Sequence, residues 1–167
     1  MLSDDTYRAR LQQTIASIKA WTGFVADVAR VEEGEIPGAW RLALTPRSAR
    51  ACSVEIVLRH DQQCDMRIAT ETYEDLALTS RDPATTLDVM LPLLEAIANG
   101  NVLTRRISSA ATGLLCSVAS IVTLRDGTVI EHVHVAPGPD PAAISGAVEI
   151  RDTHYLPYRR LGDRAAN

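Results

Sequence analysis

Residues 116–135 read CSVASIVTLRDGTVIEHVHV, two runs rich in β-branched residues on either side of Asp126-Gly127. An Asp-Gly pair between such runs is typical of a β-hairpin with a type I′ turn. A two-residue loop would pair Arg125 with Thr128, and this pairing sets the register of the whole hairpin. Because side chains alternate between the faces of a strand, one face then carries Ala119, Ile121, Thr123, Ile130, His132 and His134, and the other Val118, Val122, Leu124, Val129, Glu131, Val133 and Val135.

His132 and His134 are the best candidates for a metal site. Histidines at positions i and i+2 of a strand project from one face, about 6–7 Å apart, and can share a metal ion. The site needs a third ligand, and Asp126 is out of reach in the predicted register. Two other interpretations are open, namely solvent-exposed histidines on the wetter face of the hairpin and a pH-responsive contact. The residues that could supply a third ligand from elsewhere in the fold are His60, His154, Glu55 and Asp65.

Three alternating segments upstream of the hairpin predict further strands, over residues 38–45, 52–58 and 63–70. Each carries apolar residues at every second position, so each has one buried face, as in an antiparallel sheet covered on one side. Matching the apolar faces of the second and third strands pairs residue 58 with residue 64 and leaves a three-residue loop at 60–62.

A long helix is predicted over residues 4–30. Apolar side chains recur there in steps of four and three residues and form one stripe, and Ser3 can cap the N-terminus ahead of Asp4 and Asp5. At 1.5 Å per residue the helix would be about 40 Å long, more than a small sheet can cover. We therefore expect part of it either to pack on another subunit or to extend past its own sheet.

A second helix is predicted over residues 84–99, where Gly100 ends the apolar pattern. Pro92 indicates either a kink or a true start near Asp88. With a strand at 102–107 and the hairpin, the element order is α-β-β-β-α-β-β-β. Strands grouped in runs predict an α+β fold with a largely antiparallel sheet and both helices on one face.

The connector between the 102–107 strand and the hairpin, Ser108–Gly113, is made of small residues. If it opened a helix, its backbone N–H groups could bind an anion. The alternative is a flexible connector, since neither phosphate-binding glycine pattern is present. The residues of this candidate anion site are Arg105, Arg106, Ser108 and Ser109.

The length of 167 residues fits one domain, which we place at residues 1–136. Residues 137–141 read PGPDP, typical of a linker. The segment 137–167 is expected to hold this linker, a short strand at 147–150 and a loosely ordered C-terminal tail.

Composition limits the classes of partner. The charge sum of −4 and the lack of aromatic residues between Tyr73 and Tyr155 argue against nucleic acid. No apolar run approaches the roughly 18 residues needed to span a membrane. Three cysteines without metal-ligand spacing, Cys52, Cys64 and Cys116, favour a reducing cytoplasm, and the predicted register keeps Cys52 and Cys64 about 20 Å apart.

The sequence carries no nucleophile elbow or other catalytic signature, and it indicates no cofactor. We therefore expect a non-catalytic module that forms a homo-oligomer through its N-terminal helix and binds a protein partner or a small ligand. The alternative is a metal-binding protein or metal-dependent enzyme centred on His132 and His134. Whether the chain catalyses any reaction stays open at this point.

Overall fold

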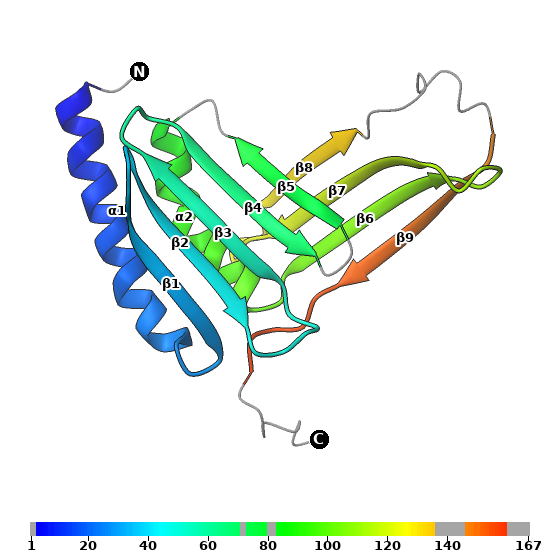
Figure 1. Ribbon diagram of the computed structural model, residues 1–167, viewed down its shortest axis with the longest axis horizontal. Helices are drawn as coiled ribbons and strands as arrows, with labels where there is room; N and C mark the ends of the chain where they lie inside the picture. Colours follow the sequence, from blue (N-terminus) through cyan, green and yellow to red (C-terminus); the bar gives the residue numbers. More distant parts are fainter. Residues whose placement is uncertain (1–2, 71–72, 80–82, 136–145, 160–167) are drawn as a thin grey trace.

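Two helices and two antiparallel sheets form the fold in the computed structural model, which describes residues 3–70, 73–79, 83–135 and 146–159 (Figure 1). The strands follow the order β1-β2-β3-β4-β5 in the first sheet and β8-β7-β6-β9 in the second. This confirms the α+β class, although the strands make two sheets where one was expected. The elements are α1 (Asp4–Val25), β1 (Ala29–Ile36), β2 (Ala39–Pro46), β3 (Ser53–Arg59), β4 (Cys64–Thr70), β5 (Tyr73–Thr79), α2 (Pro83–Ala98), β6 (Val102–Ser109), β7 (Leu115–Thr123), β8 (Val129–Val135) and β9 (Val148–His154).

Helix α1 begins as the sequence predicts. The Ser3 hydroxyl accepts a hydrogen bond from the backbone N–H of Thr6 at 3.3 Å, which satisfies one of the unpaired donors of the first turn. The helix ends at Val25, earlier than the predicted residue 30, because the chain turns there and enters β1. Its apolar stripe is buried in the chain's own core, through Tyr7, Leu11, Ile18, Thr22 and Val25.

Strand β1 occupies a segment for which no strand was predicted. Pro37-Gly38 forms the loop to β2, with Ile36 opposite Ala39 and Gly38 at a φ of +74°. The strand lies at the edge of the first sheet, and Glu32, Glu33 and Glu35 are exposed on it. Charged side chains suit an edge strand, where they discourage pairing with other molecules, but they remove the apolar alternation that identifies a strand.

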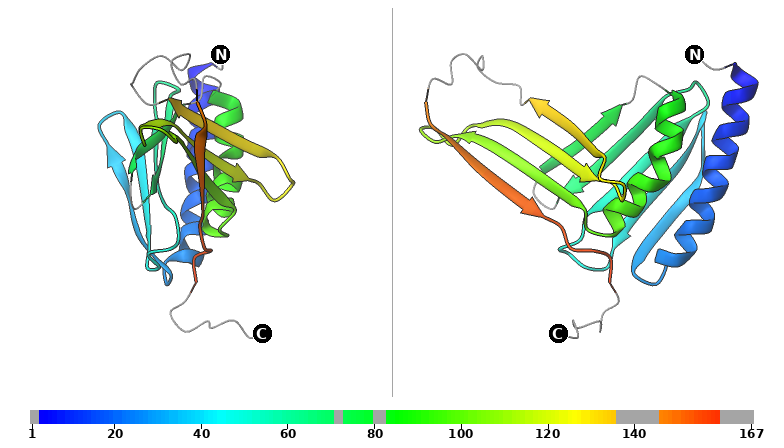
Figure 2. Two further views of the ribbon diagram at one scale, coloured as in Figure 1. Left: turned by 90° about the vertical axis from the view of Figure 1, so that its right-hand side faces the viewer. Right: turned by 180° about the vertical axis from the view of Figure 1, so that it is seen from behind.

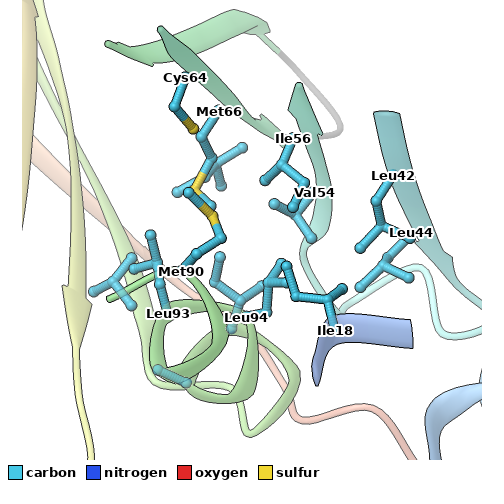
Figure 3. Packing of buried hydrophobic residues seen from close by; sticks show 14 of the residues in the cluster. Ile18, Leu42, Leu44, Val54, Ile56, Cys64, Met66, Met90, Leu93 and Leu94 are labelled. Atoms are coloured by element: carbon cyan, nitrogen blue, oxygen red, sulfur yellow. The ribbon is translucent and has the colours of Figure 1, made fainter. Parts of the chain in front are cut away.

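The core lies between the first sheet and both helices, which cover the same face of that sheet as predicted (Figures 2 and 3). The predicted register of β3 and β4 is confirmed, since Leu58 faces Cys64. The loop between them holds three residues, with Gln62 at a φ of +69°. Side chains fully buried in this core include Trp40, Leu42, Leu44, Ile56, Leu58, Met66, Ile68, Met90, Leu94 and Ile97.

Strand β5 and helix α2 also refine the predictions. No strand was predicted over Tyr73–Thr79, and the pairing of β5 with β4 changes register between Ile68 and Thr70. Such an irregularity interrupts the alternation that a strand prediction depends on. Helix α2 runs from Pro83 to Ala98 with Pro92 inside it, so the start near Asp88 was wrong.

The hairpin of β7 and β8 forms where predicted, but its register differs by one residue. Thr123 faces Val129, and the N–H of Leu124 donates to the carbonyl of Thr128 at 2.8 Å, which leaves a three-residue loop. In this loop only Gly127 is left-handed, at a φ of +87°, as in a type I turn followed by a bulge. The predicted two-residue loop was therefore wrong. Because side chains alternate between the faces of a strand, a shift of one residue places each face of β7 beside the side chains of β8 that were predicted to lie on the other face.

Strand β9 extends the second sheet beyond the predicted domain boundary at residue 136. It runs from Val148 to His154 and pairs with β6 along its length, whereas the sequence predicts a strand over 147–150 only. Beyond it, Tyr155 is buried and the N–H of Tyr158 donates to the carbonyl of Ala98 at 2.8 Å. The described part of the C-terminal segment is thus bound to the fold, whereas the predicted linker at 137–141 and residues 160–167 of the predicted tail lie outside the described residues.

Candidate functional site

The second sheet projects away from both helices and presents two different faces (Figure 2). We call the face of Val102, Thr104, Val118, Ser120 and Val122 the packed face, because these five side chains are buried. We call the opposite one the open face; the ladder assigns to it Leu103, Arg105, Ile107, Ser109, Ser117, Ala119, Ile121, Thr123, Val129, Glu131, Val133, Val135, Val148, Ile150, Asp152 and His154.

The candidate anion residues are divided between these faces. Arg105, Arg106, Ser108 and Ser109 all belong to strand β6, so the chain does not open a helix there. Alternation places Arg105 and Ser109 on the open face and Arg106 and Ser108 on the packed face. The structure therefore does not bring the four residues together as one site.

Arg105 is engaged by a carboxylate. Its Nε and Nη2 atoms donate to Oδ1 and Oδ2 of Asp152 at 2.9 and 2.8 Å, a two-point contact between neighbouring strands. The hydrogen bond from Arg105 holds the pKa of Asp152 below its usual range. Bidentate geometry of this kind orients both side chains and neutralises their charges on the open face, between β6 and the edge strand β9.

Arg106 and Ser108 line a shallow hollow of about 190 Å³ together with Gly113, Glu149 and Arg151. Arg106 lies directly opposite Arg151 in the ladder, so two like charges are neighbours there. Glu149 forms an ion pair with Arg151 at 3.2 Å and offsets part of this charge. Anion binding at this hollow stays a prediction.

The candidate metal residues lie on the packed face, not on the wetter one. His132 faces Ser120 and His134 faces Val118 across the ladder. The His132 side chain is half-buried, whereas the side chain of His134 lies outside the described part of the structure. Among the residues that are described, no three histidine, cysteine or carboxylate side chains are close enough to hold a metal ion.

The proposed third ligands lie elsewhere. Glu55 and Asp65 belong to the first sheet, where they form ion pairs with Arg41 and Arg59. His154 is on the open face of the second sheet, opposite to the face of His132. His60 is in the loop between β3 and β4.

Polar side chains on the packed face were not identified from the sequence. Ser120 is 1% exposed, and its hydroxyl has no hydrogen-bond partner among the described residues. Its ladder neighbour Thr104 is also buried and lies 3.4 Å, oxygen to oxygen, from the hydroxyl of Tyr155. The predicted register, which is wrong by one residue, explains why these polar side chains were not identified. It places Ser120 on the face opposite to His132, its partner in the structure.

The cysteines differ in their chemistry. Cys52, Cys64 and Cys116 are all free thiols. Burial raises the pKa of the Cys52 and Cys64 thiols to about 12, which removes the thiolate that a nucleophile needs.

At pH 8 we expect a disulfide reagent to label one thiol per native chain, because only Cys116 is half-exposed. Mass spectrometry after labelling and digestion identifies the residue. Denaturation should release all three thiols, and rapid labelling of Cys52 or Cys64 in the native protein would contradict the buried environment.

Comparison of the chain with protein-family models, with curated proteins and with solved structures gave no match. Among the described residues, neither helix has both the length and the apolar character needed to cross a bilayer.

Proposed function

We propose that this chain is a non-catalytic module that self-associates, with the open face of the second sheet packed against the same face of a second copy. The observation that carries the proposal is the exposure of its apolar side chains. Val133, Val135 and Ile150 are 50%, 60% and 57% exposed. Monomeric proteins rarely expose contiguous apolar patches larger than a few hundred Å², and larger ones mark interaction sites.

The size of the open face is adequate for such a contact. Its strands have seven to nine residues, and four neighbouring strands of this length cover roughly 400 Å² in projection. The accessible surface of the protruding side chains is larger than this projection. Standard interfaces bury about 800 Å² per partner, so the relief of the side chains and residues flanking the face would have to supply the area beyond this projection.

The charge distribution favours a second copy as the occupant. A two-fold axis brings one surface against itself, so the surface must not carry a net charge at its centre. The charges of Arg105 and Asp152 already neutralise each other within one chain. Burial of this pair would therefore add no net charge to the contact, and the other ionisable side chains of the open face, Glu131 and His154, lie on the outer strands β8 and β9.

The proposal moves the contact from the N-terminal helix to the sheet. The apolar stripe of α1 is used in the chain's own core, and the large apolar side chain that stands out on this helix is Phe24, 80% exposed. Association through α1 is thus the competing arrangement, and a variant of Phe24 separates the two.

A protein partner stays a prediction, as does a cytoplasmic location. The three free cysteines support the latter, because thiols persist unpaired in a reducing compartment.

Native mass spectrometry and sedimentation velocity on the untagged protein test the proposal. We expect a dimer of the 18.1 kDa chain at micromolar concentration. The double variant Val133→Lys, Ile150→Lys should be a folded monomer, because two charges would be buried on each side of the contact. The matched control, Phe24→Lys, also replaces an exposed apolar residue and should remain a dimer.

A wild-type protein that stays monomeric at 100 μM would overturn the proposal. So would dissociation by Phe24→Lys alone, which would assign the contact to α1. The same spectra report bound metal: extra mass that disappears in the His132→Ala, His134→Ala double variant would favour the metal-binding alternative.

A further inference from the structure

A pocket of about 300 Å³ lies where the two helices end. Helix α1 ends at Val25 and helix α2 ends at Ala98, and both residues line the pocket. The segment after β9 supplies Tyr158 to its wall. Three separate parts of the chain therefore meet at this site, away from the strands of the open face.

Three aromatic side chains line the pocket: Trp21, Phe24 and Tyr158. Trp21 and Tyr158 pack against the small cluster of Val25, Val28 and Ala98. Phe24 is not used in the core and leaves most of its ring in solvent. The wall of the pocket thus contains three aromatic side chains, one of them largely exposed.

The ring of Tyr158 is held in place by two hydrogen bonds. Its backbone N–H donates to the carbonyl of Ala98 at 2.8 Å, and its hydroxyl donates to the carbonyl of Cys52 at 2.6 Å. Burial raises the pKa of this hydroxyl, so the side chain is neutral at any physiological pH. A ring fixed in this way loses little entropy when a ligand binds against it.

The electrostatics of the pocket favour a cation. Neither helix has a basic residue in its last turn, so no side chain of that turn compensates the negative end of the helix dipole. The carboxylates of Asp27 and Glu95 also line the pocket, and Arg159 is the basic side chain beside them. Negative charge combined with aromatic faces is the chemistry that recognises weakly hydrated organic cations.

We propose that this pocket binds a quaternary ammonium group. Such a group is apolar on its outside and positively charged, so it gains from the rings and from the two carboxylates together. Small metal cations gain less from the rings, because they retain their water. A free choline-like molecule, a trimethylated lysine and a choline lipid all carry this group, and the pocket would recognise the chemistry that the three share.

Calorimetric titration with tetramethylammonium chloride, against sodium chloride at equal ionic strength, tests the proposal. We expect saturable binding of tetramethylammonium and of choline. We expect none of 3,3-dimethyl-1-butanol, which has the shape of choline without its charge. Parallel titrations with a trimethyl-lysine peptide and with phosphatidylcholine vesicles identify the carrier by the tightest binding.

Two pairs of variants separate the physical causes. Phe24→Leu keeps apolar bulk but removes the ring, and should weaken binding between about 2-fold and 30-fold, the range of one cation–π contact, whereas Phe24→Tyr should retain it. Glu95→Gln should weaken binding and Arg159→Ala should strengthen it, since the first removes an attractive charge and the second a repulsive one. Phe24 is exposed, so thermal unfolding should be unchanged in both Phe24 variants.

Absence of saturable tetramethylammonium binding up to 100 mM would overturn the proposal. Equal binding of the uncharged alcohol would also overturn it, because the pocket would then be an apolar cavity without preference for charge. Unchanged affinity in Phe24→Leu would have the same consequence. The proposed self-association uses the open face of the second sheet, which shares no residue with this pocket, so failure of one proposal is distinguishable from failure of the other.

Discussion

Alanine in place of Gly100 is expected to lower the free energy of unfolding by about 2–5 kcal/mol. Two costs add up in this value, that of a left-handed backbone conformation and that of a steric overlap. Gly100 follows helix α2 and has a φ of +77°. A Cβ atom there would lie 2.6 Å from the nitrogen of Pro157 and 2.9 Å from the carbonyl carbon of Leu156. Both are backbone atoms, so the C-terminal segment would have to move away from the helix.

Gly38 provides a matched control for this prediction. Its φ of +74° is nearly the same, but a Cβ atom would meet nothing within 4 Å. Gly38→Ala should therefore lose only about 1–2 kcal/mol, from the backbone conformation alone. Urea denaturation of the two variants, followed by tryptophan fluorescence, measures the difference, and equal losses would show that the close approach to Pro157 is unimportant.

The Gly100→Ala variant also affects the aromatic pocket. Tyr158 follows Pro157 directly and donates to Ala98 of the same helix end. Movement of this segment should weaken tetramethylammonium binding, whereas Gly38→Ala should leave it unchanged.

Leu94→Ala is expected to lower the free energy of unfolding by about 2–5 kcal/mol, the range for a buried leucine. Leu94 is 0% exposed and lies in the core among Ile18 of α1, Met90 of α2 and the strand residues (Figure 3). Truncation would leave a cavity between layers that cannot collapse easily, because the helices and the sheet constrain each other.

Leu114→Ala is the matched control, since it removes the same atoms from a residue that is 57% exposed. It should change the free energy of unfolding by no more than about 0.5 kcal/mol. Chemical denaturation with a common m-value compares the two. Similar losses in both variants would contradict the assignment of Leu94 to the core.

The elements that the sequence predicts well have a strong local period. Strands β2 to β4 alternate apolar and polar residues, and the pairing of Leu58 with Cys64 follows from matching their apolar faces. The stripe of α1 and the cap at Ser3 likewise depend on residues close to one another in the chain. In contrast, β1 and β5 carry charges or an irregular register and give no such signal.

The hairpin of β7 and β8 shows where local information is insufficient. Both of its faces carry β-branched residues, so matching apolar faces does not distinguish two registers. The Asp126-Gly127 pair suits a two-residue loop and equally a three-residue loop with only Gly127 left-handed. The structure has the second arrangement, and this alone moves His132 and His134 from the predicted wetter face to the packed one.

The sequence by itself determined the α+β class, the places of both helices and of most strands, and the register of β3 with β4. These features follow from side-chain periodicity and turn chemistry within short segments. Only the tertiary structure decided that the strands form two sheets, that Arg105 meets Asp152, and that Trp21 and Tyr158 share one pocket. Such contacts join residues far apart in the chain, and their geometry depends on how whole layers pack, which no local pattern encodes.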